Sequence, residues 1–117
     1  MLDRQSILNA PDRTFEEMDV PEWGGKVRIG VMSGTDRDSY FNTFPPKRER
    51  TEDMDWTPFR YKLLVRCIID ENNQRIFQDD EADLLASKNT EVLERLMTVA
   101  GRINKLTETS AEETKNA

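Results

Sequence analysis

Residues 90–106 constrain the fold more than any other segment, because they have the pattern of a long amphipathic helix. Charged side chains fall on one side of its helical wheel, and Asn89 or Thr90 can cap its first turn. The helix must therefore close the core of its own domain or pack on another chain, for which a second copy of this chain is one candidate. The apolar stripe consists of Val92, Leu93, Leu96, Met97, Ala100, Ile103 and Leu106.

The amino-terminal part of the chain predicts a β-hairpin. Residues 14–20 contain β-compatible side chains, and residues 26–32 alternate apolar with polar or small ones, as a half-buried strand does. Between them the sequence PEWGG supplies one proline with a fixed φ and two glycines that tolerate positive φ. We therefore expect the chain to reverse direction within residues 21–25.

Two helices are predicted after the hairpin. Thr35 is a candidate cap for the first, which places Tyr40, Phe41 and Phe44 on its inner side and ends at Pro45-Pro46. A polar connection over residues 47–55 follows. The second helix begins near Asp55 or Thr57 and has the spacing of a central, mostly buried helix, although its nearly continuous apolar runs leave a buried strand as the alternative. The apolar positions on which this rests are Phe59, Leu63, Leu64, Cys67 and Ile68.

A turn over residues 70–75 and a short helix precede the long one. Ile76-Phe77 is expected to be an extended apolar anchor, and Asp79 is a candidate cap for a helix that contains Leu84 and Leu85. The patterns together predict an α+β fold, with an N-terminal β-hairpin followed by a mostly helical body of about four helices. We expect a single domain over residues 1–106 and a disordered tail over residues 107–117, which have no large apolar side chain.

Composition excludes much enzyme chemistry. The 117 residues contain no histidine and one cysteine, which removes Ser-His-Asp triads, histidine-ligated zinc and internal disulfides. Cys67 lies in an apolar run and is expected to be a core residue rather than a nucleophile. We therefore expect no catalytic residue, no metal and no cofactor.

The charge distribution argues against nucleic acid and membrane partners. The net charge is −6, and the residues up to Arg60 and those after it each carry −3, so neither half presents a basic surface. No apolar stretch is long enough for a signal peptide or a membrane span. We expect a highly charged, soluble, cytosolic protein.

Residues 70–81 superficially resemble a calcium-binding loop. The sixth position of such a loop requires a glycine for its sharp turn and is Arg75 here, and the fifth position is the longer Gln74. We therefore interpret the segment as a polar turn before an acid-capped helix. The candidate ligands that this interpretation rejects are Asp70, Asn72, Gln74, the carbonyl of Ile76 and Glu81.

Three aromatic residues could serve the core or an interface. Phe77 and Trp56 are expected to be core residues, because a chain with only 36% hydrophobic residues has few others to use. Trp23 is equally suited to either role, since it lies at the predicted turn, where burial is harder to arrange. Aromatic side chains concentrate binding energy in small patches, so Trp23 is a candidate partner anchor.

The order of these features resembles the tail assembly chaperones of long-tailed, siphovirus-type bacteriophages. The resemblance rests on residues 12–20, on VPEWGGKVRIGVMSGTDRD over residues 20–38, on LLVRCIIDENNQRIF over residues 63–77, and on the helices of residues 84–106. Two features depart from the family: Asn72-Asn73-Gln74 stands where members often have a glycine, and the segment from Pro45 to Trp56 is an unusual insertion.

The resemblance implies a non-enzymatic helper that solubilises the tape-measure protein and helps recruit the major tail protein, working in the host cytoplasm and absent from the finished virion. It also implies that a frameshifted, extended form can exist. Two other functions remain open: a structural tail component, such as a completion or minor tail protein, and a small regulatory protein-binding module. The expected partner-binding residues are Trp23, Val92, Leu96, Val99, Ile103 and Leu106.

Overall fold

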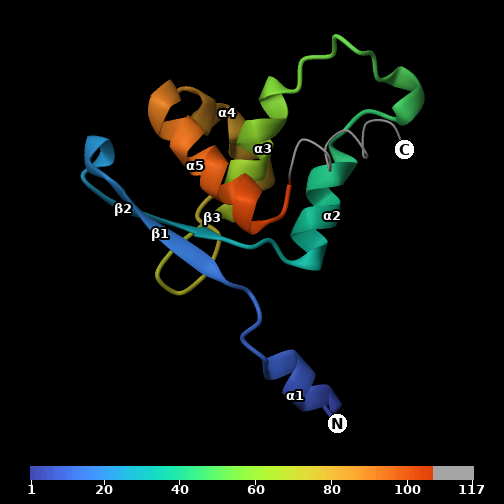
Figure 1. Cartoon of the computed structure of the whole chain (residues 1–117), viewed down its shortest axis with the longest axis vertical. Coiled ribbons are helices and arrows are strands. Elements are labelled where there is room, and N and C mark those ends of the chain that lie inside the picture. The colour runs from blue at the N-terminus through green and yellow to red at the C-terminus, as the bar shows by residue number, and fades with distance from the viewer. Residues whose placement is uncertain (107–117) are drawn as a thin grey trace.

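A three-stranded antiparallel sheet lies under two packed helices. The computed structural model describes residues 1–106. Strand β1 (Phe15–Val20) pairs with β2 (Gly25–Gly30), and β2 pairs with the short β3 (Ile68–Ile69), so the sheet order is β1-β2-β3. Helix α5 (Thr90–Ile103) packs over β1 and β2 and against α3 (Thr57–Cys67) (Figure 1). This arrangement confirms the predicted α+β fold, and β3 lies in the apolar run for which a buried strand was the alternative to a helix.

The hairpin forms as predicted. Phe15 pairs with Gly30 and Val20 pairs with Gly25, and the chain reverses through a 3-10 turn at Pro21–Trp23. Of the two adjacent glycines, only Gly24 has a positive φ, of 79°, and it ends this turn, whereas Gly25 already belongs to β2. A left-handed residue at this position favours glycine because a Cβ atom would clash with the backbone.

The four helices of the body are α2 (Gly34–Asn42), α3, α4 (Ala82–Ala86) and α5. Ser33 caps α2 through its hydroxyl, which accepts the N–H of Asp36, so the predicted cap at Thr35 was wrong by two residues. Thr35 already lies inside the helix. The predicted cap at Asn89 is confirmed, because its side chain accepts the N–H of Val92.

The remaining boundaries also differ from prediction in small ways. Gln78 rather than Asp79 precedes the 3-10 turn at Asp79–Glu81 that leads into α4. Helix α3 ends at Cys67, and the chain then becomes extended, so the apolar run contains both a helix and a strand. Helix α5 ends at Ile103, because Lys105 adopts a left-handed φ of 58° that no helix continues.

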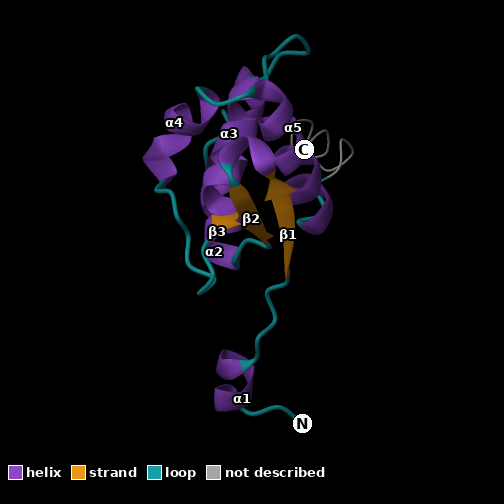
Figure 2. Ribbon diagram, turned by 90° about the vertical axis from the view of Figure 1, so that its left-hand side faces the viewer, coloured by secondary structure: helices purple, strands orange, loops and turns teal. Residues whose placement is uncertain are grey.

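A short helix, α1 (Arg4–Asn9), precedes the hairpin and was not predicted. Asp3 caps it by accepting the N–H of Ser6, and none of its residues is buried. In Figure 2 this helix stands apart from the body, joined to it by an extended segment. No helix within residues 1–106 is long and apolar enough to cross a membrane.

Candidate partner-binding surface

The apolar stripe of α5 closes the domain's own core. Val92, Leu96 and Ala100 are completely shielded from solvent, and they belong to the same buried cluster as Leu64 of α3 and Ile29 of β2. Val92 and Leu96 therefore have no surface left with which to touch a partner in this fold. Of the two roles left open for the stripe, core formation accounts for these two residues.

The other four expected partner-binding residues are partly exposed, but the structure does not bring them together. Trp23 lies at the hairpin turn, whereas Leu106 borders a separate cavity of about 180 Å³ beside Tyr40, Phe41 and Phe44. Val99 and Ile103 are half-buried on α5, one turn apart. The candidate surface around Trp23 is therefore built from other residues than those of α5.

Trp23 borders an open cavity of about 410 Å³ between the hairpin turn and α4. Phe77 and Leu84 line it from the other side, and Leu84 is 58% exposed. The sequence pattern placed Leu84 in a helix without indicating whether its side chain faces the core or solvent. A helix as short as α4, with five residues, does not define an apolar face. Leu85, its buried neighbour in α4, also lines this cavity.

A second cavity of about 410 Å³ adjoins the first, since Trp23 and Phe77 line both. Its apolar lining includes Val27 of β2, Ile68 of β3 and Ile76, which is 53% exposed. Ile76 was predicted to be an anchor, but its side chain faces solvent, and only Phe77 packs against the core. The two cavities form a continuous apolar groove, which we call the Trp23 groove.

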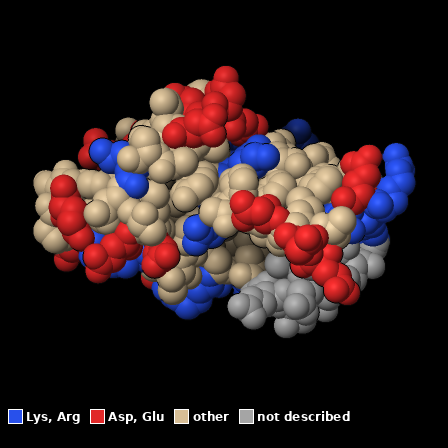
Figure 3. All heavy atoms as spheres, turned by 90° about the horizontal axis from the view of Figure 1, so that it is seen from above, with Lys and Arg blue, Asp and Glu red and all other residues tan. Residues whose placement is uncertain are grey.

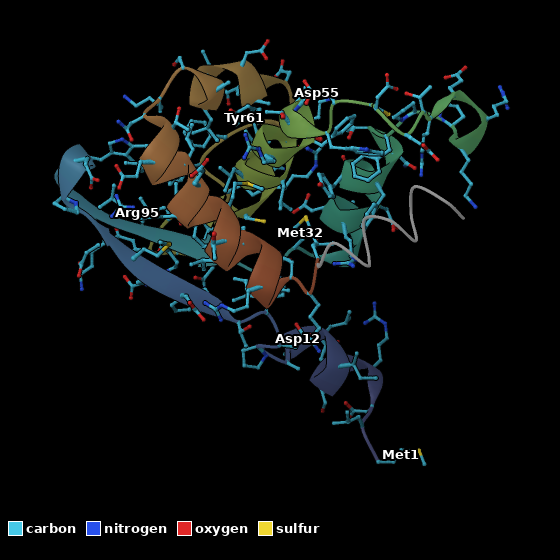
Figure 4. The ribbon with its side chains drawn as sticks, turned by 45° about the horizontal axis from the view of Figure 1, so that its top comes forward. Met1, Asp12, Met32, Asp55, Tyr61 and Arg95 are labelled. Atoms are coloured by element: carbon cyan, nitrogen blue, oxygen red, sulfur yellow. The ribbon has the colours of Figure 1, made fainter. Side chains whose placement is uncertain are left out.

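Charged side chains stand at the rim of the Trp23 groove. Glu22 accepts a hydrogen bond from Arg95 of α5 at 2.6 Å, and this bond holds the pKa of the Glu22 carboxyl below its ordinary value. Arg95 is labelled in Figure 4, where α5 passes over the hairpin. The Lys88 ammonium lies 5.9 Å from the centre of the Trp23 ring. Acidic and basic side chains are also interspersed over the face seen in Figure 3.

A network of arginines and acids holds the loop that carries Phe77. Arg75 contacts Asp36 of α2 at 3.2 Å and Asp79 at 2.7 Å, and its Nε donates to the carbonyl of Val65. Arg66 is 4% exposed and lies 3.4 Å from the same Asp79 carboxylate. Because a buried arginine needs compensating charge, Asp79 and Asp36 keep this loop against α2 and α3.

The turn at residues 70–75 uses its polar groups internally. One carboxylate oxygen of Asp70 accepts the backbone N–H groups of Asn72 and Gln74. Asn73 has a φ of 64°, a conformation that asparagine tolerates better than most residues other than glycine. Asn73 thus takes the role expected of a turn glycine, and Arg75, which occupies the position where a calcium loop needs one, belongs to the network above.

Cys67 is a core residue, as predicted. Its side chain is 1% exposed, and burial raises the pKa of its thiol to about 12. The Asn104 amide donates to its sulfur at 3.5 Å. A thiol with this pKa is almost entirely protonated at neutral pH, so it does not act as a nucleophile there.

Comparisons with known proteins place this arrangement in a family. The fold is similar to that of the bacteriophage HK97 tail assembly chaperone, with a TM-score of 0.56, 20% identity, and coverage of 89% of this chain and 92% of that one. At this identity the likeness shows the fold alone. Comparison with curated proteins gave no match. A family model described as phage tail assembly chaperone matches residues 3–116. Because that match spans nearly the whole sequence, the chain belongs to the phage tail assembly chaperone family, whose members are non-enzymatic chaperones.

Proposed function

We propose that this chaperone binds an apolar helical segment of the tape-measure protein in the Trp23 groove and helps to recruit the major tail protein during tail assembly. The observation that carries the proposal is the apolar surface that the exposed Leu84 and Ile76 form with the half-buried Trp23 and Phe77, on an otherwise highly charged chain. Exposed apolar grooves rimmed by charges are typical docking sites for amphipathic helices.

The groove has the features that reversible binding of the tape-measure protein requires. Its aromatic residues provide binding energy in a small area, while the charged rim keeps the unoccupied chaperone from associating without specificity. On this proposal the chaperone acts in the host cytoplasm and leaves before the tail is complete. Val99, Ile103 and Leu106, which lie elsewhere on the surface, remain candidates for a further contact with tail proteins.

Co-expression with the tape-measure protein tests the proposal. We expect the wild-type chaperone to increase the soluble fraction of the tape-measure protein and to co-purify with it. The variants Trp23→Ala and Leu84→Ser should lose both effects while remaining folded. Leu8→Ser is the matched control for Leu84→Ser, since Leu8 is 61% exposed, lies on α1 and lines neither cavity of the groove. If the solubility of the tape-measure protein is the same with and without the chaperone, the proposal is wrong.

Tryptophan fluorescence tests the location of the site directly. The chain has two tryptophans, and Trp56 packs against Phe44 and Phe59 with ring centres 5.1 and 5.2 Å away. In a Trp56→Phe background Trp23 is the only emitter, and its emission should shift to shorter wavelength when a tape-measure helix covers it. An unchanged spectrum in a complex that still forms would place the binding site elsewhere.

The two other functions predict different results. A structural tail component would be found by mass spectrometry in purified virions at a fixed ratio to the other tail proteins. A regulatory module would bind one folded partner in a one-to-one complex and leave the solubility of the tape-measure protein unchanged. Either result would replace the proposed function.

A further inference from the structure

Strand β1 has a free edge whose backbone groups can be assigned from the ladder. The carbonyl of Thr14 accepts the N–H of Val31 at 2.9 Å, so these two residues form a hydrogen-bonded pair. Hydrogen-bonded pairs alternate along an antiparallel ladder, and the next ones are therefore Glu16 with Ile29 and Met18 with Val27. It follows that the N–H and C=O groups of Phe15, Glu17 and Asp19 point away from β2.

No other strand covers this edge within residues 1–106. The sheet order is β1-β2-β3, so β1 is an outer strand, as Figure 2 shows. In that part of the chain, no backbone hydrogen bond from Phe15, Glu17 or Asp19 reaches any group outside the ladder. The free edge is six residues long, which corresponds to about 20 Å of extended chain.

The side chains along this edge are acidic and only partly neutralised. On the solvent face of the sheet, Glu17 lies opposite Arg28 and Asp19 lies opposite Lys26. The Arg28 guanidinium donates hydrogen bonds to the carbonyl of Glu71 and to the side chain of Asn73. The Glu17 carboxylate lies 3.8 Å from the same guanidinium, so its charge is only partly neutralised. Asp19 is exposed and forms no ion pair within the described residues. The acids of β1 therefore retain charge with which to attract a second row of basic groups.

We propose that the free edge of β1 accepts an extended segment of a partner protein as an added strand. The segment carries Lys or Arg opposite Glu17 and Asp19, which continues outward the acid–base pattern that β2 and β1 already form. An extended segment is the fitting occupant because only a strand presents N–H and C=O groups at the spacing of this edge. Glu17 also lines the second cavity of the Trp23 groove, so the two sites adjoin. They differ in their occupants: the groove binds a helix through apolar side chains, whereas this edge binds an extended segment through backbone hydrogen bonds.

The same acids also have a protective explanation. Charged side chains on edge strands commonly prevent sheets from pairing with other chains. On that explanation a basic extended peptide would gather near the acids without forming backbone hydrogen bonds. The experiment must therefore observe the backbone amides of β1 rather than binding alone.

The test uses the full chain and a synthetic peptide of alternating Lys and Val, seven residues long and blocked at both ends, with amide exchange followed by NMR. In the free protein, the amides of Phe15 and Glu17 should exchange fast and those of Glu16 and Met18 slowly. Saturating peptide should slow the exchange of Phe15, Glu17 and Asp19 by at least roughly tenfold. Two control peptides are used. One is N-methylated at alternate amides, which keeps the charge and removes backbone donors. The other has Glu in place of Lys, which keeps the backbone and reverses the charge.

Variants separate the backbone contribution from the charge. Glu17→Pro removes one outward N–H, which an edge strand tolerates, and should weaken peptide binding roughly tenfold. The double variant E17K/D19K should abolish binding, whereas E91K/E94K, the same charge change at exposed positions of α5, should reduce it far less. The proposal is overturned if the outward amides remain unprotected at millimolar peptide, or if the N-methylated peptide binds as well as the parent.

Discussion

The side-chain oxygen of Asn104 accepts the backbone N–H of Met32 at 2.8 Å, across 72 residues of sequence. The same amide donates to the carbonyl of Ala100 at 2.9 Å, and the carbonyl of Asn104 accepts a hydrogen bond from Arg37. Asn104 is 5% exposed. This single side chain therefore joins the end of α5 to the segment between β2 and α2, in a place where water cannot replace it.

Asn104→Ala should destabilise the protein by about 2 kcal/mol, because it leaves the Met32 N–H buried without an acceptor. Urea unfolding followed by circular dichroism measures the loss. Asn72→Ala is the matched control, since Asn72 is exposed at a turn and should change stability by less than about 0.5 kcal/mol. Equal losses in the two variants would contradict the importance of the buried amide.

Stability should fall in acid, partly through Asp79. The hydrogen bond from Arg75 holds the pKa of the Asp79 carboxyl below its ordinary value of 3.8, so the folded state favours the charged form. This contribution is present above the ordinary value and is lost as the pH falls through the lowered one. Glu16 and Glu22 also have pKa values lowered by hydrogen bonds from arginines. The urea midpoint should therefore decrease between about pH 5 and pH 2.

Asp79→Asn isolates the contribution of this carboxylate. The variant should be less stable than wild type at pH 7, because Arg66 and Arg75 lose a shared counter-ion, and its further loss in acid should be smaller. Asp83→Asn, at an exposed carboxylate that forms no ion pair within the described residues, should follow the wild-type profile. If the stability of Asp79→Asn changes with pH in parallel with that of wild type, the Asp79 carboxylate does not contribute to the loss of stability in acid.

The two adjacent glycines of the turn should respond differently to alanine. Gly24→Ala should cost about 1 kcal/mol, because the φ of 79° is unfavourable for a residue with a Cβ atom. Gly25→Ala should change stability by less than about 0.5 kcal/mol, since nothing lies within 4 Å of the added Cβ. Thermal unfolding of the two variants checks this. Equal shifts in melting temperature would contradict the turn geometry.

Cys67 should be inert in the folded protein. Its burial and its pKa of about 12 predict that a thiol-reactive aromatic disulfide gives no reaction at pH 8 in native buffer and one equivalent of product in denaturing urea. Release of the coloured product is measured by absorbance. Rapid reaction without denaturant would mean that the region around Cys67 opens, and hydrogen exchange in α3 would then have to be correspondingly fast.

Much of the fold was predictable from short-range patterns. The strand at Gly25–Gly30 follows from alternation, and the helix at Thr90–Ile103 follows from apolar spacing and the Asn89 cap. The predicted caps at Thr35 and Asp79 were wrong, because Ser33 caps α2 and Gln78 precedes the turn that leads into α4. The hydrogen bonds at both boundaries join residues three apart in the sequence, a pattern that neighbouring polar residues can also form.

The binding surface was predictable only in part. Trp23 was found because an aromatic residue at a turn is hard to bury, but nothing in the spacing distinguished exposed Leu84 from buried Leu85. The stripe of α5 was expected to serve either the core or a partner, and the burial of Val92 and Leu96 shows that it serves the core. The expected disorder of residues 107–117 lies outside the residues that the structure describes.

The sequence by itself determined the hairpin, the helices of the body and their order, though not α1, because helix and strand periodicity, caps and turn residues act over a few positions. Only the tertiary structure decided which side chains meet. Asn104 reaches Met32 and Arg75 reaches Asp36 through contacts between segments far apart in the chain, and Trp23 lines the same cavities as the distant Phe77. The Trp23 groove and the free edge of β1 come from that assembly, since burial depends on what each face packs against rather than on local spacing.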